Sequence, residues 1–457
     1  MDEFTGAYGD ERRAAAVARL HRAMVERRTV VVRKLGGDRR GEVSAHQALG
    51  SPRVTAPETI ARLARRTAQA AAGRRVVVAQ DTTEVSFSGR VSRGLGPAGR
   101  RGTAPGFFVH AAVAVDVETA AVLGLVSAEI WTREGRSDGP GTSDRRARVL
   151  ADKESRRWLA AAETAAERLD AAAEVVVVGD RESDIYALFA RRPERVHLLV
   201  RAAQDRALED GARLFAAAAA WPVLGRYAVA VPPRGPGDRG RSAEVTLRAG
   251  AVTVRRPRNG RPEGDPATLE VALVEAVEEH PPPGAAPLRW RLLTTLPVRT
   301  EAEAAEAVRL YRLRWRIEQT WRTLKGEGLR IEDAQTHTPH RLLNLAALAL
   351  GAAVRIIQLV DARDGGPRPA SDAADEGQIA AAAALCPTLE GGTERQRNPH
   401  APGSLAWLSW IIARLGGWNC YGKPPGPKTM HDGWRRFAAI AEGYALSHTA
   451  THDACIP

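Results

Sequence analysis

The segment YRLRWRIEQTWRTLKGEG contains four side chains of different chemistry, Tyr311, Arg314, Glu318 and Lys325. At about 100° per residue, one continuous helix would place them within a sector of about 60°. A carboxylate flanked by cations suits a group that holds a metal ion beside phosphates. The alternative is a solvated helix face with i,i+4 ion pairs. That alternative is weakened at Lys325, because only five of the 66 Lys and Arg residues are lysines.

Two aspartates follow runs of apolar residues that are typical of buried strands. Asp81 comes after VVVAQ and begins DTTE, and Asp180 comes after VVVVG and begins DRESD. Each aspartate alone could be a strand-terminating turn or a helix cap. Together with Glu318, they would form an all-oxygen site, which suits two Mg²⁺ or Mn²⁺ ions that also bind a substrate phosphate.

The elements that must position these acids can be predicted from the pattern of apolar residues. Strands are expected at 76–79, 109–115, 122–130 and 175–178, with a helix over 158–169 before the last of them. This order predicts an α/β core built on a mixed sheet. From about 226 to 294 the chain alternates like antiparallel strands, at 227–231, 244–248, 252–255, 269–277 and 288–293, and helix resumes from Glu301.

The N-terminal and C-terminal regions differ in charge and in predicted secondary structure. Residues 10–30 and 55–72 are predicted to be helical, the second with capping-box spacing from Thr55 to Glu58, and GGDRRGEVSAHQALGSPR between them is expected to be a loop. Residues 1–75 carry 16 Lys and Arg against 8 Asp and Glu, a net charge of +8. Residues 361–403 are expected to be a loose linker, and a final helical segment is expected from Ser404.

Composition limits the class of protein. The 457 residues suffice for about two or three domains with a sizeable core. A net charge of +12 and a pI near 10.3 favour a polyanionic partner such as nucleic acid. The N-terminus has no apolar signal segment, and residues 342–360 are broken by polar side chains, so a buried helix is expected there rather than a membrane span. Cys386, Cys420 and Cys455 lack metal-ligand spacing, which indicates a reducing, cytoplasmic location.

The sequence resembles the DDE transposases with the YREK signature, the bacterial insertion-sequence family numbered four. QDTTE, GDRESDIY and the spacing Tyr-x2-Arg-x3-Glu-x6-Lys are similar to the three catalytic blocks of that family. Further similar segments occur in the family's order: GLGP, FVH at 108–110, DKESRRWL at 152–159, WRLLTTLPV at 290–298, IARLGGW at 412–418 and GWRRF at 433–437. The helix that usually precedes the GDERR block is expected to be shortened or absent.

The resemblance implies roles for individual residues. Asp81, Asp180 and Glu318 match the catalytic, metal-binding triad, which implies two Mg²⁺ ions per active site, with Mn²⁺ able to substitute. The remaining matches imply DNA contacts: Tyr311, Arg314 and Lys325 with the phosphate backbone, Trp290 by stacking on a flipped base, and Arg201 after the second aspartate. The alternative for Trp290 is an ordinary buried strand indole.

The resemblance also implies an organisation and an activity. The expected domains are a basic helical DNA-binding domain at 1–72, an RNase H-like core at 73–360 with a β-rich insertion at about 205–294, and a linker with a helical dimerisation region at 361–457. The implied activity is cut-and-paste transposition. The expected partners are the transposon-end inverted repeats, target DNA and a second copy of the chain, without a membrane and associated with the nucleoid when DNA is bound. Two alternatives are a regulator or inhibitor that binds ends without cutting, and an RNase H-like nuclease acting on other nucleic acids.

Overall fold

A computed structural model gives the fold of the chain. It describes residues 3–87, 94–99, 104–133, 156–231, 240–257, 264–326, 328–336, 338–366, 368–422 and 424–453. The chain divides into two compact units. Unit 1 comprises Met1–Ala72, Thr82–Ser137 and Arg316–Pro457, and unit 2 comprises Gly73–Asp81 and Asp138–Trp315. The first boundary between them falls inside one strand, directly after Asp81.

Unit 2 is built on a mixed sheet. The first part of β1 pairs with β5 in parallel, and β5 pairs with β6 in parallel. The remaining strands continue antiparallel in the order β6-β10-β9-β8-β7. The strands are β1 (Arg75–Ser86), β5 (Glu174–Gly179), β6 (Val196–Arg201), β7 (Gly225–Val231), β8 (Arg241–Arg255), β9 (Thr268–Val277) and β10 (Arg289–Thr294). The predicted α/β class with a mixed sheet is therefore confirmed.

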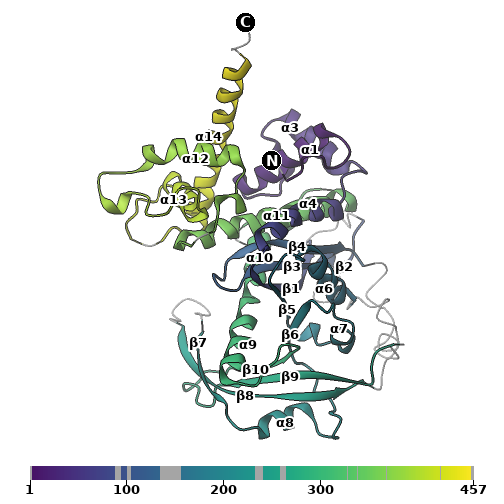
Figure 1. Ribbon diagram of the computed structural model, residues 1–457. Helices are drawn as coiled ribbons and strands as arrows, with labels where there is room; N and C mark the ends of the chain where they lie inside the picture. The colour runs from purple at the N-terminus through teal and green to yellow at the C-terminus, as the bar shows by residue number, and fades with distance from the viewer. Residues whose placement is uncertain are drawn as a thin grey trace. The chain divides into compact units, whose positions relative to one another are not determined.

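Helices pack on this sheet and bury its apolar side chains. The valine runs of β1 and β5 are buried, as expected for parallel strands that are covered on both faces. Helix α6 contacts β5 and β6, and both α8 and α9 contact the long strands β8 and β9 (Figure 1). The helices of unit 2 are α6 (Arg156–Arg168), α7 (Tyr186–Ala190), α8 (Leu214–Ala220) and α9 (Glu301–Leu313). The first residues of the DKESRRWL segment, 152–155, lie outside the described residues.

The prediction of two separate strands at 244–248 and 252–255 is wrong. The segments 244–248 and 252–255 form a single strand, β8, which runs through Gly250. A Cβ atom at Gly250 would lie 3.0 Å from the ring of Trp221. The glycine therefore lets an indole pack directly on the strand, and it does not mark a turn.

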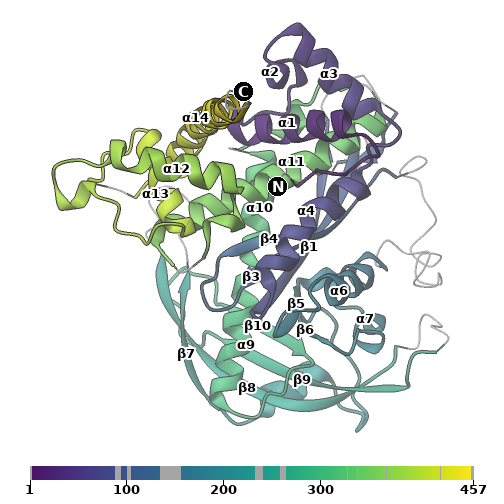
Figure 2. The same cartoon turned by 45° about the horizontal axis from the view of Figure 1, so that its top comes forward.

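Unit 1 combines helices with the antiparallel pairs β2-β3 and β3-β4. Helices α4 and α11 pack on β4, and α1, α3 and α14 pack on α11 (Figure 2). The strands are β2 (Gly96–Ala98), β3 (Ala104–Asp116) and β4 (Val122–Trp131). The helices are α1 (Glu11–Arg27), α2 (Val32–Gly36), α3 (Arg39–Gly50), α4 (Ala56–Ala71), α10 (Trp315–Lys325), α11 (Pro339–Asp361), α12 (Glu376–Leu389), α13 (Leu405–Leu415) and α14 (Pro427–Asp453).

The N-terminal helices α1 and α4 agree with prediction, but the loop expected between them is wrong. It contains α3, and the short helix α2 precedes it. Asp38 caps α3 by accepting a hydrogen bond from the Gly41 N–H at 2.7 Å. Ala45, Ala48 and Leu49 are buried on this helix, which packs on α1 and α11. Tertiary packing of a few small side chains overrides the low apolar content of the segment.

Helix also occurs within the segment expected to be a linker. Residues 376–389 form α12, which starts with a capping box between Asp375 and Gln378 and continues into an alanine run. Helix α13 begins after Ser404 as predicted, and the Ser404 side chain accepts a hydrogen bond from the Trp407 N–H. In the described part of the chain, α11 is long and apolar enough to cross a membrane, but 83% of its most apolar window is buried inside the protein. This burial agrees with the prediction of a core helix.

Candidate active site

Asp81 and Asp180 lie at equivalent positions on neighbouring parallel strands. The last register pair between β1 and β5 is Ala79 with Val178. Each aspartate lies two residues beyond its member of that pair, at the carboxyl end of β5 and at the same level of β1. Because adjacent parallel strands are about 4.8 Å apart, this register brings the two acids to one edge of unit 2. Carboxyl ends of parallel strands are the usual place for ligands in open α/β sheets.

Each aspartate has its own local partners. Arg314 Nη1 lies 3.7 Å from Asp81 Oδ2, and both side chains are only 14% exposed. Asp180 accepts a hydrogen bond from the Glu182 N–H at 2.8 Å and so caps a short 3₁₀ turn. Burial, with a contribution from the charge of Asp180, raises the pKa of Glu182. The edge thus concentrates acidic groups, and Arg314 supplies positive charge beside one of them.

Aromatic and basic side chains from β6, β10 and α9 gather in the same unit. The rings of Trp290 and Tyr311 contact each other, with centroids 6.0 Å apart and planes tilted by 60°. Arg201 Nη2 donates to the carbonyl oxygen of Arg289 at 3.2 Å, next to Trp290. Burial raises the pKa of Tyr311, although the charges of Arg314 and Arg201 oppose the shift, so its hydroxyl stays protonated at neutral pH. Five of the predicted site residues in unit 2 are therefore linked through this environment: Arg201, Trp290, Tyr311, Arg314 and Asp180.

The predicted single helix that carries Tyr311 and Lys325 is interrupted. Helix α9 ends at Leu313 and α10 begins at Trp315, while Arg314 between them keeps helical angles, with φ −52° and ψ −31°. The division into units also falls here, and Glu318 and Lys325 belong to unit 1. In the described residues, no group of three or more His, Cys, Asp and Glu side chains could hold a metal ion. The joint triad of Asp81, Asp180 and Glu318 therefore stays a prediction.

Helix α10 presents apolar side chains to the core of unit 1. Ile317, Trp321 and Leu324 are buried. Lys325, at the end of the helix, is partly buried, and this burial lowers its pKa against the opposing charges of Glu332 and Glu84.

Trp315 is a candidate that the sequence analysis missed. It follows Arg314 directly, and its side chain is 51% exposed. The apolar pattern of the segment assigns core positions to its neighbours Ile317 and Trp321, but periodicity alone does not distinguish an exposed indole from a buried one. An exposed tryptophan beside a site arginine is available for stacking on a nucleic-acid base.

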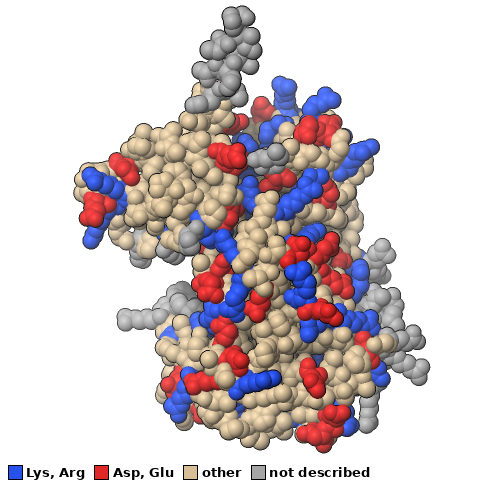
Figure 3. Space-filling model, viewed as in Figure 1, with Lys and Arg blue, Asp and Glu red and all other residues tan. Residues whose placement is uncertain are grey.

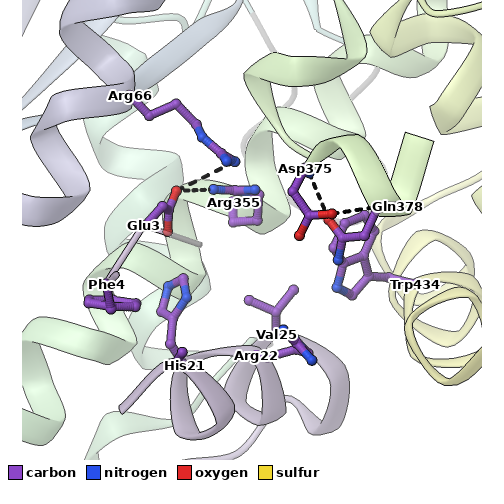
Figure 4. Close-up of a pocket in the computed structure, with 11 residues that line it drawn as sticks. Glu3, Phe4, His21, Arg22, Val25, Arg66, Arg355, Asp375, Gln378 and Trp434 are labelled. Atoms are coloured by element: carbon purple, nitrogen blue, oxygen red, sulfur yellow. Dashed lines mark hydrogen bonds and ion pairs between the residues drawn. The ribbon is translucent and has the colours of Figure 1, made fainter. Parts of the chain in front are cut away.

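A pocket in unit 1 contains a different charged cluster. The carboxylate of Glu3 lies between Arg66 and Arg355, with Arg66 Nη1 3.6 Å away (Figure 4). Burial opposes ionisation of Glu3, but the charges of Arg355, His21 and Arg66 outweigh it and lower the pKa of Glu3. The pocket has a volume of about 60 Å³, and none of the predicted site residues lines it. We interpret it as an ion-paired cluster that anchors the N-terminal segment.

The surface of the N-terminal region is rich in basic residues. Arg33, Lys34, Arg39 and Arg40 of α2 and α3 are exposed; we name these four the α2–α3 basic cluster. Figure 3 shows Lys and Arg side chains projecting where Figure 1 labels α3, with some acidic side chains among them. The basic cluster is suited to contacts with phosphates.

Of the three cysteines, Cys386 and Cys420 are free thiols, and Cys455 lies outside the described residues.

A mixed α/β sheet with two acids at one edge, next to an arginine and aromatic side chains, is the arrangement expected of a metal-dependent enzyme acting on phosphodiesters. Residues 148–355 match the family model described as a transposase DDE domain. The matched range contains Asp180, Glu318 and the signature residues from Tyr311 to Lys325, and it begins after Asp81. This match supports a DDE transposase, a class that acts on DNA with divalent metal ions.

Proposed function

We propose that the protein is a cut-and-paste DNA transposase of the YREK-signature insertion-sequence family, with an RNase H-like core. It binds the inverted repeats at the ends of its element, cleaves the phosphodiester there and joins the freed 3′-OH to target DNA. The observation that carries this proposal is the placement of Asp81 and Asp180 at the same level, one within β1 and the other directly after β5, together with the match of residues 148–355 to a transposase DDE domain.

Asp81, Asp180 and Glu318 are the proposed metal ligands. Their donors are all carboxylate oxygens, one of them within β1 and one directly after β5, and this donor set fits two Mg²⁺ ions, or Mn²⁺ in their place. When bound, such ions supply activation of a water and stabilisation of the leaving 3′ oxygen. Within the protein, Arg314 offsets the charge of Asp81 and limits repulsion between neighbouring acids.

The remaining site residues would bind the DNA end. Arg314 and Lys325 supply positive charge for the phosphate backbone, and the protonated Tyr311 hydroxyl can donate a hydrogen bond to a phosphate oxygen. Trp290 is the proposed platform for a base flipped out as a hairpin forms at the cut end. Arg201 and the exposed Trp315 would contact the same end.

The N-terminal and C-terminal regions would bind the repeats and a second protomer, respectively. We assign end recognition to the basic residues 1–72, and assembly of a dimer around two ends to the helices within 361–457. The net charge of residues 1–75, +8, supports the first assignment.

The test uses the purified protein and a plasmid that carries the DNA flanking its gene. We expect Mg²⁺-dependent release of a fragment whose boundaries coincide with short inverted repeats, with 3′-OH ends, and no release in EDTA. Specific binding to the repeats without cleavage would indicate an end-binding regulator. Cleavage of unrelated DNA or RNA with equal efficiency would indicate a general nuclease.

A further inference from the structure

A buried ion pair joins the turn that follows Asp180 to the segment that follows Arg201. Asp184 is 7% exposed and Arg206 is 8% exposed. The Arg206 guanidinium forms an ion pair with the Asp184 carboxylate and donates a second hydrogen bond to the Asp184 carbonyl oxygen at 2.9 Å. The other carboxylate oxygen accepts from the N–H groups of Ala203 at 2.7 Å and Gln204 at 2.8 Å. We name this set of contacts the Asp184 clamp.

On one side, the clamp continues the turn that holds Asp180. Ser183 is fully buried, and its hydroxyl donates to the Asp180 carbonyl oxygen at 2.6 Å. A Cβ atom at Gly179 would lie 2.2 Å from the Ser183 hydroxyl oxygen, so only glycine allows the turn to close this tightly against β5. The backbone from Asp180 to Asp184 is therefore fixed at both ends.

On the other side, the clamp holds the chain where β6 ends. The Ala202 N–H donates to the Arg291 carbonyl oxygen at 2.8 Å, so this segment stays attached to β10. The Arg206 carbonyl oxygen accepts from the Leu214 N–H at 2.9 Å, at the start of α8. Arg201 lies directly before the clamped segment, and Trp290 lies on the strand paired with it.

We infer that Asp184 and Arg206 are positioning residues that fix the Asp180 carboxylate relative to Arg201 and Trp290. Asp184 belongs to the DRESD motif, but its carboxylate is fully engaged with two backbone N–H groups and one guanidinium, so it is not a metal ligand. A charged pair that is buried and also hydrogen bonded to backbone has a defined geometry, which a site needs if it must hold metal ligands and DNA contacts in register. This inference rests on the proposed function, because it assigns roles to Asp180 and Arg201.

The experiment compares Asp184→Asn with a matched control, Glu278→Gln, in the full-length protein. Asparagine keeps the volume of Asp184, but it must present its NH₂ group either to Arg206 or to the two backbone N–H groups. Glu278 is 3% exposed, forms an ion pair with Arg241 and accepts a hydrogen bond from the Leu288 N–H at 3.0 Å. It offers the same chemistry after β9, with Arg241 and Leu288 as the partners of its carboxylate in place of residues next to Asp180 or Arg201.

Four quantities are measured for each variant: the melting temperature, the affinity for end DNA in EDTA, Mn²⁺ binding followed by electron paramagnetic resonance, and the cleavage rate at saturating DNA. We expect both variants to melt earlier. Only Asp184→Asn should weaken Mn²⁺ binding and metal-free end binding, and it should slow cleavage on the order of 10- to 100-fold. Arg206→Lys keeps the positive charge opposite Asp184, so its losses of Mn²⁺ binding, end binding and cleavage should be smaller than those of Asp184→Asn.

Equal behaviour of Asp184→Asn and Glu278→Gln in all measurements except melting would overturn the clamp. Loss of Mn²⁺ binding without any change in DNA affinity would also overturn it, because that result would identify Asp184 as a metal ligand. A wild-type protein that binds DNA and Mn²⁺ but does not cleave would contradict the proposed function, and the two binding measurements would still decide the role of the clamp.

Discussion

Asp81 and Asp180 each lie two residues beyond the register pair Ala79–Val178, on two neighbouring parallel strands of unit 2. The sheet itself therefore sets their spacing, and neither acid depends on a long loop. This placement explains why a metal site can be inferred although the aspartates are separated by almost 100 residues of sequence. Arg314 lies 3.7 Å from Asp81, so an ion pair with a basic side chain is present at this edge.

Replacement of Trp290 separates a stacking role from a core role. Stacking of a base on an aromatic ring contributes roughly 1–3 kcal/mol. If this energy acts only on the distorted DNA end, Trp290→Ala should spare the first nick and slow hairpin formation or resolution by about 5- to 150-fold, since about 1.4 kcal/mol corresponds to tenfold. Single-turnover rates for each step measure this, and Trp290→Phe should recover part of the loss.

A second tryptophan provides the control. Trp221 packs on Gly250 in the same unit. Trp221→Ala should therefore lower the melting temperature without slowing the hairpin steps more than the first nick. If Trp290→Ala impairs nicking and hairpin steps alike, with a comparable drop in melting temperature, Trp290 is a core residue, as its contact with Tyr311 alone would suggest.

The α2–α3 basic cluster should determine much of the salt dependence of DNA binding. Changing Arg33, Lys34, Arg39 and Arg40 to Gln should lower the affinity for end DNA. It should also reduce the slope of log affinity against log salt by about 0.9 for each phosphate that the variant no longer neutralises. Binding isotherms at several salt concentrations measure both quantities. The exposed pair Arg395 and Arg397, changed to Gln, serves as the control, and an equal effect of that pair would contradict a specific role of the cluster.

Glu26 should make unit 1 less stable as the pH rises. Burial raises its pKa to about 7, against the charges of Arg22 and Arg27 and with a contribution from Glu442. The folded state therefore binds more protons than the unfolded state between about pH 4.5 and 7, and the free energy of unfolding falls with pH over that window. Glu26→Gln should melt above the wild type at pH 8, by a few degrees at about 2–4 °C per kcal/mol.

The same comparison at about pH 5 tests the assignment, because the wild-type carboxyl is then largely protonated in the folded state and the two proteins should melt close together. A difference between the two melting temperatures that stays constant from pH 5 to 8 would show that the charge of Glu26 is not responsible.

The sequence predicts those features that depend on local pattern. The valine runs of β1 and β5 and the helix that starts at Glu301 have strong signals, and Thr300 with Glu303 closes a capping box there. The position of Asp180 directly after β5 follows from the same runs, whereas β1 does not end before Asp81 as expected and continues to Ser86. Helix α3 could not be predicted this way, because only Ala45, Ala48 and Leu49 are buried on it, and its one further large apolar side chain, Val43, is exposed.

The site includes features that depend on tertiary structure. The interruption at Arg314 has no glycine or proline to mark it, and the exposure of Trp315 depends on the neighbouring elements. Similarly, the DRESD motif contains two aspartates with the same local signals, and only the contacts of Asp184 with Arg206 distinguish its role from that of Asp180.

The most direct test of the central claim is Mg²⁺-dependent cleavage of the element's end by Asp180→Ala, with Asp81→Ala and Glu318→Ala alongside it. If the three acids form one metal site, each variant should bind end DNA with an affinity close to that of the wild type and release no cut end above background. Cleavage by Asp180→Ala at the wild-type rate would contradict the account, because Asp180 would then hold no ion that the reaction needs.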